Sequence, residues 1–506
     1  MESFVEAAVL CLAGASLVRT LIKPAARREM REHPIAVGAP SIVGVGVATL
    51  LIVARSYWLR VMVAIVLISW AGLAWRARPE MGRRRGLPPG SLGWRQSLDA
   101  IVDPQFYQRE AARCGHVFKM AQFHRPVACI VGLETGRRLL RDHKAQLHPP
   151  ALPLSEAVPR GFLRYMTPTD HAKYAPLFRT AISEAALARV EAFARQEIRR
   201  MLNGLAAASA EAGSPGVDPR PTLERALVRV LSRLYFGEML RAEDQAVIDQ
   251  CSRDSAMQSA TGRASEKAVA SLNRFVSLLE ERSATYDWSR DCSIWSELDR
   301  CDPESLKDRT VTGNLFLLFA ASRGSVGGLL LWIVQMLSES PRWMAAARES
   351  APVARGGDAV TDDPAARAVI ETLRLAQSEY VYRELLAPIA IGPFTIPKGW
   401  LMRICVAESH RLDPPFAEPN RFNPDRHIGR RYSSTELAPF GLDNHWCLGA
   451  RMSLTLGRIL AAELLEHFDC AATADGPRVR ENRHWSHWQP NPSLRVSIRR
   501  RSEVVA

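Results

Sequence analysis

Apolar residues gather in three stretches at the beginning of the chain, at about residues 3–22, 35–54 and 57–75. Each stretch approaches a length of about 20 residues, which a helix needs to cross a bilayer. Basic residues fill the first connection and follow the third stretch. The positive-inside tendency therefore predicts three membrane helices that leave the rest of the chain in the cytoplasm. A single anchor followed by an interfacial hairpin is the alternative.

A basic segment rich in Pro and Gly comes next, at residues 79–95. Its prolines fix φ and its glycines break helices, so it is predicted to be a stiff hinge. The predicted organisation is a membrane anchor at residues 1–78, the hinge at 79–95 and one large domain at 96–506.

Helical periodicity dominates the large domain. Residues 115–131 are the exception and predict a hairpin of two β-strands. Residues 306–339 form the longest helical pattern, and their middle part is apolar enough for a fourth membrane span. Arg323 and a cluster of three glycines favour a core helix that a ligand approaches closely. We therefore expect a mainly α domain with a small β-rich lobe.

Composition restricts the possible functions. The chain has 506 residues and a net charge of +13, and residues 1–95 hold thirteen Lys and Arg against five Asp and Glu. This concentration of charge indicates a membrane-facing segment and argues against a nucleic-acid partner. The nine cysteines include no CxxC pair, which argues against a zinc site and a disulfide framework. Reduced thiols are consistent with a cytoplasmic domain.

The most informative motif surrounds Cys447, which lies in a turn directly before a helical pattern. A helix N-terminus and its unpaired N–H groups favour a thiolate over a thiol. A thiolate is an axial ligand for haem iron. Phe440 is placed to shield the sulfur and His445 to meet a haem carboxylate. The alternative is a buried structural cysteine.

The loop resembles the cysteine loop of the cytochrome P450 superfamily, Phe-Gly-x-Gly-x-Arg/His-x-Cys-x-Gly. The matching residues are Phe440, Gly441, His445, Cys447 and Gly449. Asp443 stands where the family has glycine, and we expect it to adopt a positive φ, which Asp visits more readily than most residues. The resemblance implies a haem b whose iron is bound by Cys447.

Other matches to the family follow the same order along the chain. Glu371 and Arg374 form a Glu-x-x-Arg pair, and the family joins such a pair to an arginine that matches Arg421, in a buried triad that holds the cysteine loop. In isolation the pair would be a solvated salt bridge. Arg383 and His171 match the family's haem-propionate partners. His171 opens a helix for which Thr169 or Asp170 is the expected N-cap.

The family's oxygen-activating helix carries Ala-Gly-x-acid-Thr. Counting back from Pro341 places Ser325 at the threonine, Gly324 at the acid and Ala321 at the alanine. The alcohol is kept as Ser325, but the carboxylate that helps to relay protons is missing. The helix therefore resembles an atypical member of the family.

The resemblance implies a monooxygenase that oxidises a lipophilic small molecule with O₂ and electrons from a ferredoxin or reductase. The missing acid leaves open an isomerase, a dehydratase or a peroxide-driven enzyme. A haem-binding membrane protein without turnover is a third possibility. The excess of Arg over Lys is associated with GC-rich bacterial genomes, so the expected location is a bacterial inner membrane, with several spans and a cytoplasmic catalytic domain.

Overall fold

The structure is a computed structural model. It describes residues 86–93, 96, 99–100, 103–122, 125–150, 158–212, 216–256, 266–287, 291, 293–350, 363–377, 380–443, 445–473, 479–480 and 488–501. The predicted membrane helices and the first part of the predicted hinge lie outside the described residues. The chain divides into two compact units: one runs to His148 and includes Tyr382–Cys405, and the other holds Pro149–Val381 and Val406–Ala506.

The first unit is built on a six-stranded sheet with the order β1-β2-β3-β8-β5-β4. Its strands are β1 (Gly90–Ser91), β2 (Val117–Gln122), β3 (Arg125–Ile130), β4 (Leu147–His148), β5 (Tyr380–Leu385) and β8 (Leu401–Cys405), and a separate hairpin joins β6 (Ile389–Ile391) to β7 (Phe394–Ile396). Helices α6 (Phe106–Cys114) and α7 (Leu133–Asp142) belong to the same unit.

The predicted hairpin is confirmed, because β2 and β3 pair antiparallel from Val117↔Ile130 to Gln122↔Arg125. Strand β8 adds to β3 in parallel, with Val127 opposite Leu401. Most side chains of β2, β3 and β8 are buried, which explains why their sequences show no alternation of polar and apolar residues.

The second unit is mainly helical. Its longer helices are α8 (Pro168–Ala181), α9 (Glu184–Ala212), α10 (Arg220–Phe236), α11 (Gln245–Ala256), α12 (Glu266–Thr285), α13 (Ile294–Cys301), α14 (Arg309–Ser338), α15 (Pro341–Ser350), α16 (Pro364–Thr372) and α18 (Ala450–His467). Shorter elements are η2 (Leu163–Tyr165), η3 (Ala242–Asp244), η5 (Pro303–Lys307), the π-helical turn η7 (Leu373–Gln377), α17 (Val406–Ser409), η8 (Pro424–His427) and strands β9 (Phe468–Thr473), β10 (Val479–Arg480), β11 (Trp488–Gln489) and β12 (Arg495–Arg500).

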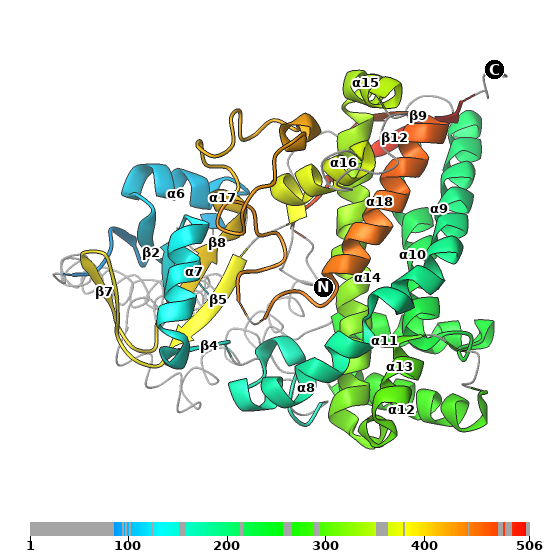
Figure 1. Cartoon of the computed structure of the whole chain (residues 1–506), viewed down its shortest axis with the longest axis horizontal. Helices are drawn as coiled ribbons and strands as arrows, with labels where there is room; N and C mark the ends of the chain where they lie inside the picture. Colours follow the sequence, from blue (N-terminus) through cyan, green and yellow to red (C-terminus); the bar gives the residue numbers. More distant parts are fainter. Residues whose placement is uncertain are drawn as a thin grey trace, which may run out of the picture. The chain divides into compact units, whose positions relative to one another are not determined.

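Helix α14 is the centre of this unit. It begins where the Asp308 side chain accepts the N–H of Thr310, and it ends at Ser338, within three residues of the predicted bounds. It is the one helix in the described part of the chain with the length and hydropathy to cross a membrane. However, α10, α16 and α18 pack along it (Figure 1), and most of its side chains are buried. This packing supports the interpretation as a core helix.

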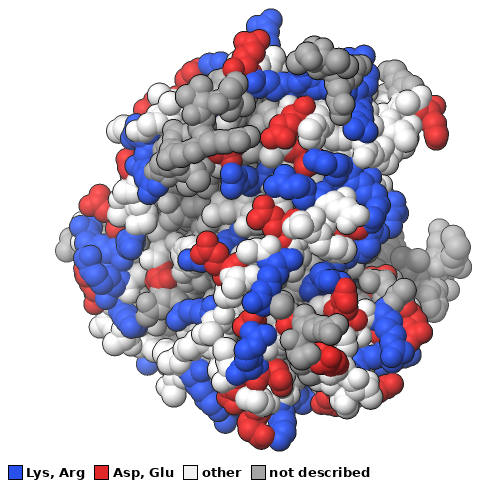
Figure 2. Space-filling view, turned by 45° about the vertical axis from the view of Figure 1, so that its right-hand side comes forward, with Lys and Arg blue, Asp and Glu red and all other residues white. Residues whose placement is uncertain are grey.

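The predicted fold, mainly α with a small β-rich lobe, is confirmed for the described residues. On the surface in Figure 2, Lys and Arg are interspersed with Asp and Glu. Ion pairs in the second unit include Arg451 with Glu184 (2.8 Å) and Arg189 with Glu297 (3.7 Å).

Candidate functional site

The loop before α18 is closed by its own backbone. The N–H of Cys447 donates to the carbonyl of Phe440 at 2.9 Å, and Gly441 takes a φ of +104°, which a residue with a Cβ adopts only with strain. Cys447 itself is exposed. It lies two residues before Gly449, the N-cap of α18. The loop therefore presents one accessible thiol at the start of a long buried helix.

Asp443 does not take the positive φ that we expected from its place in the motif. Among the described non-glycine residues, only Glu418 has a positive φ. Instead, the Asp443 carboxylate accepts the N–H of His445 at 2.9 Å, and its carbonyl accepts the N–H of Trp446 at 3.0 Å. A side-chain turn of this kind is what Asp forms readily. The departure from the family motif is therefore accommodated by hydrogen bonds.

The protonation of Cys447 also differs from the expectation. Solvent reaches the residue, yet the protein atoms around the sulfur desolvate a thiolate, and this raises the pKa of the Cys447 thiol. The N–H of Gly449 and the positive charge of Arg164 act in the opposite direction but do not outweigh the desolvation. A helix start alone is therefore insufficient, and a bound metal ion would be needed to favour the thiolate.

We predict that Cys447 in haem-free protein reacts slowly with an alkylating reagent at neutral pH, because the thiolate is the reactive form. Its rate should still be rising above pH ~8.5, the ordinary pKa of a cysteine. Peptide mass spectrometry of the full chain would measure the rate, with exposed Cys301 as a reference for reagent quality. A plateau below the ordinary thiol range would contradict the raised pKa.

Two histidines predicted to meet haem carboxylates come together in the second unit. The rings of His171, from α8, and His445, from the loop, lie 4.0 Å apart with an angle of 36° between their planes. Helix α8 begins two or three residues earlier than expected, since Thr167 is its N-cap and accepts the N–H of Asp170. Arg383 belongs to the other unit and is buried on β5, where it donates to the carbonyl of Tyr382 at 2.7 Å.

The middle of α14 presents small residues. Ala321 is exposed, and Gly324 and Ser325 are half-buried. Between them, the buried hydroxyl of Ser322 shares a 2.8 Å hydrogen bond with Tyr235 of α10. Arg323 pairs with Glu224 of α10 and lies 4.0 Å from Asp249 of α11, so its charge is neutralised by acids on neighbouring helices.

Glu371 is the centre of a buried hydrogen-bonded group. Its Oε1 accepts from Arg374 Nη2 (2.8 Å), the Asn423 N–H (3.0 Å) and Arg426 Nε (3.0 Å), and its Oε2 accepts from Arg374 Nε (2.9 Å) and lies 3.2 Å from His427 Nε2. Burial acts to raise the pKa of Glu371, but Arg374, His427 and Asn423 together lower it to about 2. The carboxylate is therefore ionised at neutral pH.

Arg374 uses all five of its N–H donors. Besides the two bonds to Glu371, its Nη1 donates to the carbonyls of His410 (2.8 Å) and Pro419 (2.7 Å), and its Nη2 donates to the carbonyl of Arg421 (3.2 Å). The side chains of Arg374 and Glu371 are completely buried. The pair joins the end of α16 to residues 410–421, which precede the Cys447 loop in the chain.

The prediction that Arg421 is the third member of the triad is wrong. Its side chain is 67% exposed and pairs with Glu418 at 3.0 Å, and only its backbone carbonyl enters the group. Arg426 takes its place, because the Asn423 side chain caps η8 and this short helix turns Arg426 inward. The sequence contained the signal: Pro-x-Arg occurs at 419–421 and again at 424–426.

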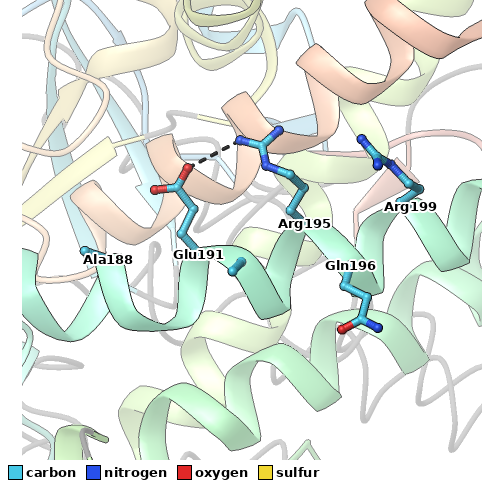
Figure 3. A pocket seen from close by; sticks show the side chains of 6 residues that line it. Ala188, Glu191, Arg195, Gln196 and Arg199 are labelled. Atoms are coloured by element: carbon cyan, nitrogen blue, oxygen red, sulfur yellow. Dashed lines mark hydrogen bonds and ion pairs between the residues drawn. The ribbon is translucent and has the colours of Figure 1, made fainter.

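The described part of the second unit contains at least two pockets. One, of about 600 Å³, borders the loop at Asp443, Trp446 and Leu448. The other, of about 530 Å³, is lined only by α9 and contains no predicted site residue. Figure 3 shows Arg195 paired with Glu191 beside this second pocket. The buried carboxylate of Glu463 on α18 accepts from both Arg195 and Arg199.

The residues around Cys447 are better suited to bind an iron that a macrocycle already holds than to bind a free metal ion. No group of three or more His, Cys, Asp or Glu side chains within the described ranges could chelate a metal ion. A single accessible thiol can complete the coordination of an iron that a macrocycle already holds. The rings of His171 and His445 lie against each other, and His445 precedes Cys447 by two residues in the chain, so the same loop also supplies a polar ring.

Comparisons with known proteins agree with this geometry. The cytochrome P450 family profile matches residues 289–497. Putative cytochrome P450 135B1 of Mycobacterium bovis is 26% identical over 206 residues, covering 40% of this chain and 43% of that protein. Ent-kaurenoic acid oxidase 1 of Hordeum vulgare is 23% identical over 475 residues, covering 85% of this chain and 93% of that protein. The chain thus spans less than half the length of the mycobacterial relative that it matches.

Solved structures show the same fold. The structure described as "Retinoic acid bound cyanobacterial CYP120A1" has a TM-score of 0.67 at 18% identity, covering 82% of this chain and all of that one. In sequence and in fold, the chain is thus similar to members of the cytochrome P450 superfamily. The predicted enzyme class, a P450-type oxidoreductase, and the predicted cofactor, a haem iron ligated by cysteine, agree with these similarities and stay predictions.

Proposed function

We propose that this protein is a haem-thiolate monooxygenase that hydroxylates or similarly oxidises a lipophilic small molecule. Its electrons would come from a ferredoxin or a reductase. The observation that supports this most directly is the accessible Cys447 thiol, held by the Phe440 carbonyl at the start of α18. The names of two similar proteins mention ent-kaurenoic acid and retinoic acid, which is consistent with a lipophilic substrate.

The residues that would hold the haem follow from the loop and its surroundings. Cys447 would bind the iron, and Phe440 would cover the sulfur. The positive φ of Gly441 lets the backbone turn tightly. A Cβ at Gly449 would lie 3.2 Å from the Met452 side chain and 3.9 Å from the Cys447 sulfur, so glycine keeps space beside the ligand. His445, His171 and Arg383 would meet the haem carboxylates. When bound, the haem supplies oxygen activation at its iron, which the thiolate promotes by donating electron density.

The middle of α14 would provide space for the reacting groups and deliver protons to them. Ala321 and Gly324 leave space beside the helix backbone, and the Ser325 hydroxyl would position a water that delivers protons. Because Gly324 replaces the usual acid, this delivery would depend on the hydroxyl alone.

We expect Ser325→Ala to lower the product formed per NAD(P)H oxidised by about ten- to a hundredfold, or roughly 1.4–2.7 kcal/mol for one positioned hydroxyl. Ser322→Ala is the matched control, because the Ser322 hydroxyl is already bonded to Tyr235 on α10. It should leave the coupling unchanged. Gly324→Asp, which restores an acid, should keep or improve the use of O₂. Unchanged coupling in Ser325→Ala would remove Ser325 from the mechanism.

The missing acid also supports a second candidate, an isomerase, dehydratase or peroxide-driven enzyme. Such an enzyme needs no electrons from NAD(P)H, so Ser325→Ala would not change electron use. Purified protein should be assayed with NAD(P)H and a surrogate ferredoxin system on one side, and with peroxide or substrate alone on the other. Product formed without NAD(P)H would reject the monooxygenase and favour the second candidate.

We further propose that residues 1–78 anchor the chain with three membrane helices, that 79–95 connect, and that 96–506 form the catalytic domain in the cytoplasm of a bacterium. The supporting observation is the distribution of apolar and basic residues along 1–95.

Deleting residues 1–85 should move the protein from the membrane fraction to the soluble fraction with its haem retained, because the apolar stretches are then absent. Western blots of separated fractions and the haem spectrum would measure this. Orientation is tested with a C-terminal tag in inverted membrane vesicles, where added protease should remove it. A tag digested only from the periplasmic side would overturn the proposed topology.

A further inference from the structure

The described part of the predicted hinge is bonded to the sheet of the first unit. Residues Gly90–Ser91 form β1, which pairs in parallel with β2 so that Gly90 lies opposite Lys119. The N–H of Lys119 donates to the carbonyl of Pro89 at 2.7 Å. At the beginning of the segment, the N–H of Thr395 on β7 donates to the carbonyl of Gly86 at 2.6 Å. The segment is thus held at both ends.

Lys119 makes the most unusual contact. The residue is 3% exposed, and its Nζ donates to the carbonyl of Pro88 at 2.6 Å. A single residue therefore satisfies both proline carbonyls, one through its side chain and one through its backbone. Burying an ammonium is costly unless it is hydrogen-bonded. The Lys119 ammonium has this hydrogen bond only when the segment is docked, which a flexible spacer would not provide. Burial also lowers the pKa of Lys119.

The composition of the segment fits this contact. Gly90 has a φ of +114°, and a Cβ there would lie 2.2 Å from the carbonyl oxygen of Lys119. Only glycine allows the two backbones to approach so closely. The two prolines restrict the unbound chain, which reduces the entropy lost when the segment docks. Leu92, just beyond β1, is buried.

We propose that residues 86–91 are a docking strand that fixes the membrane anchor to the β-sheet unit, with Lys119 as the latch. The proposal rests on the proposed membrane anchor, since it concerns how that anchor is attached. The Pro- and Gly-rich segment is then no spacer. Because the segment is bonded to β2 and β7, the chain would leave the bilayer next to these strands. The segment would therefore determine which edge of this unit stays near the membrane surface.

Amide hydrogen exchange of the full chain in vesicles of phosphatidylethanolamine and phosphatidylglycerol tests the latch. The amides of residues 119 and 395 donate to the segment, so both should be protected. Lys119→Met removes the ammonium, and Gly90→Ala forces the backbones apart. Each variant should speed exchange at Thr395 by about tenfold or more, as local opening becomes easier. Lys398→Met, at an exposed lysine of the same unit, should have no effect.

The outcomes separate the latch from the anchor, because sedimentation of the chain with the vesicles is measured in the same samples. Protected amides in a chain that does not sediment would reject the anchor and leave the docking strand intact. Unprotected amides in a chain that does sediment would overturn the latch. Variants that exchange at the wild-type rate would also overturn it, because Lys119 and Gly90 would then contribute nothing to docking.

Discussion

Replacing Cys447 by Ser should abolish the long-wavelength absorption band that a thiolate ligand gives the reduced carbon-monoxide complex, and product formation should fall to the background. This is the largest effect we expect from any single substitution. A serine hydroxyl keeps the size of the side chain and its place in the loop. It does not supply the polarisable, electron-donating sulfur on which the haem chemistry depends.

Other cysteines provide the controls. Cys301→Ser changes an exposed thiol at the end of α13 and should leave the band intact. Cys405→Ser changes a buried thiol in β8, and any effect should follow from packing and leave the position of the band unchanged. The absorption spectrum of the reduced carbon-monoxide complex, recorded at equal haem content, measures all three variants. A band that survives in Cys447→Ser would mean that another cysteine binds the iron.

The second large effect concerns the buried group around Glu371. Arg374→Ala leaves this carboxylate without its main partner, and breaking a buried pair costs about 3–5 kcal/mol of stability. We therefore expect a variant that folds poorly or loses its haem. Arg426→Ala removes the charged hydrogen bond to Glu371, which should cost about 1.5–3 kcal/mol. It also removes the bonds that Arg426 donates to the carbonyls of Ala417, Glu418 and Arg421. Arg421→Ala should stay within about 0.5 kcal/mol of wild type, because that side chain is exposed.

Urea unfolding of the haem-loaded protein in detergent measures the three variants. Equal losses in Arg421→Ala and Arg426→Ala would contradict the assignment of Arg426 to the group. The pH dependence gives a second readout. The pKa of Glu371 is lowered from 4.5 to about 2 on folding, so its contribution is complete above pH 4.5 and is lost as the pH falls toward 2. Glu371→Gln should flatten this part of the stability curve.

Much of the second unit could be predicted from local patterns. The helical pattern at 306–339 predicted α14 to within three residues, and the resemblance to the family predicted that the Glu371–Arg374 pair is buried. Two features could not be predicted from the spacing of residues, because they depend on three-dimensional contacts. The choice between Arg421 and Arg426 depends on the turn capped by Asn423, and the pKa of Cys447 depends on the atoms that surround its sulfur.

The first unit shows a different limit of the sequence. The hairpin of β2 and β3 is local, and its pattern predicted it. The pairing of Gly90 with Lys119 joins residues far apart in the chain, and nothing in the Pro- and Gly-rich segment itself indicates a partner. The composition indicated stiffness, but stiffness alone does not distinguish a spacer from a docked strand.

The five hydrogen bonds of Arg374 limit how the sequence can change over time. No other side chain carries five N–H donors in one plane, and a lysine offers only three around a single atom. Three of the acceptors are backbone carbonyls, which remain whatever residues replace His410, Pro419 or Arg421. If Arg374 is replaced, these carbonyls lose their hydrogen-bond donor, and no second substitution at the same positions can remove the carbonyls. Position 374 therefore requires arginine, and a change there cannot be compensated elsewhere. Position 421 contributes only its backbone carbonyl, so it can accept other side chains.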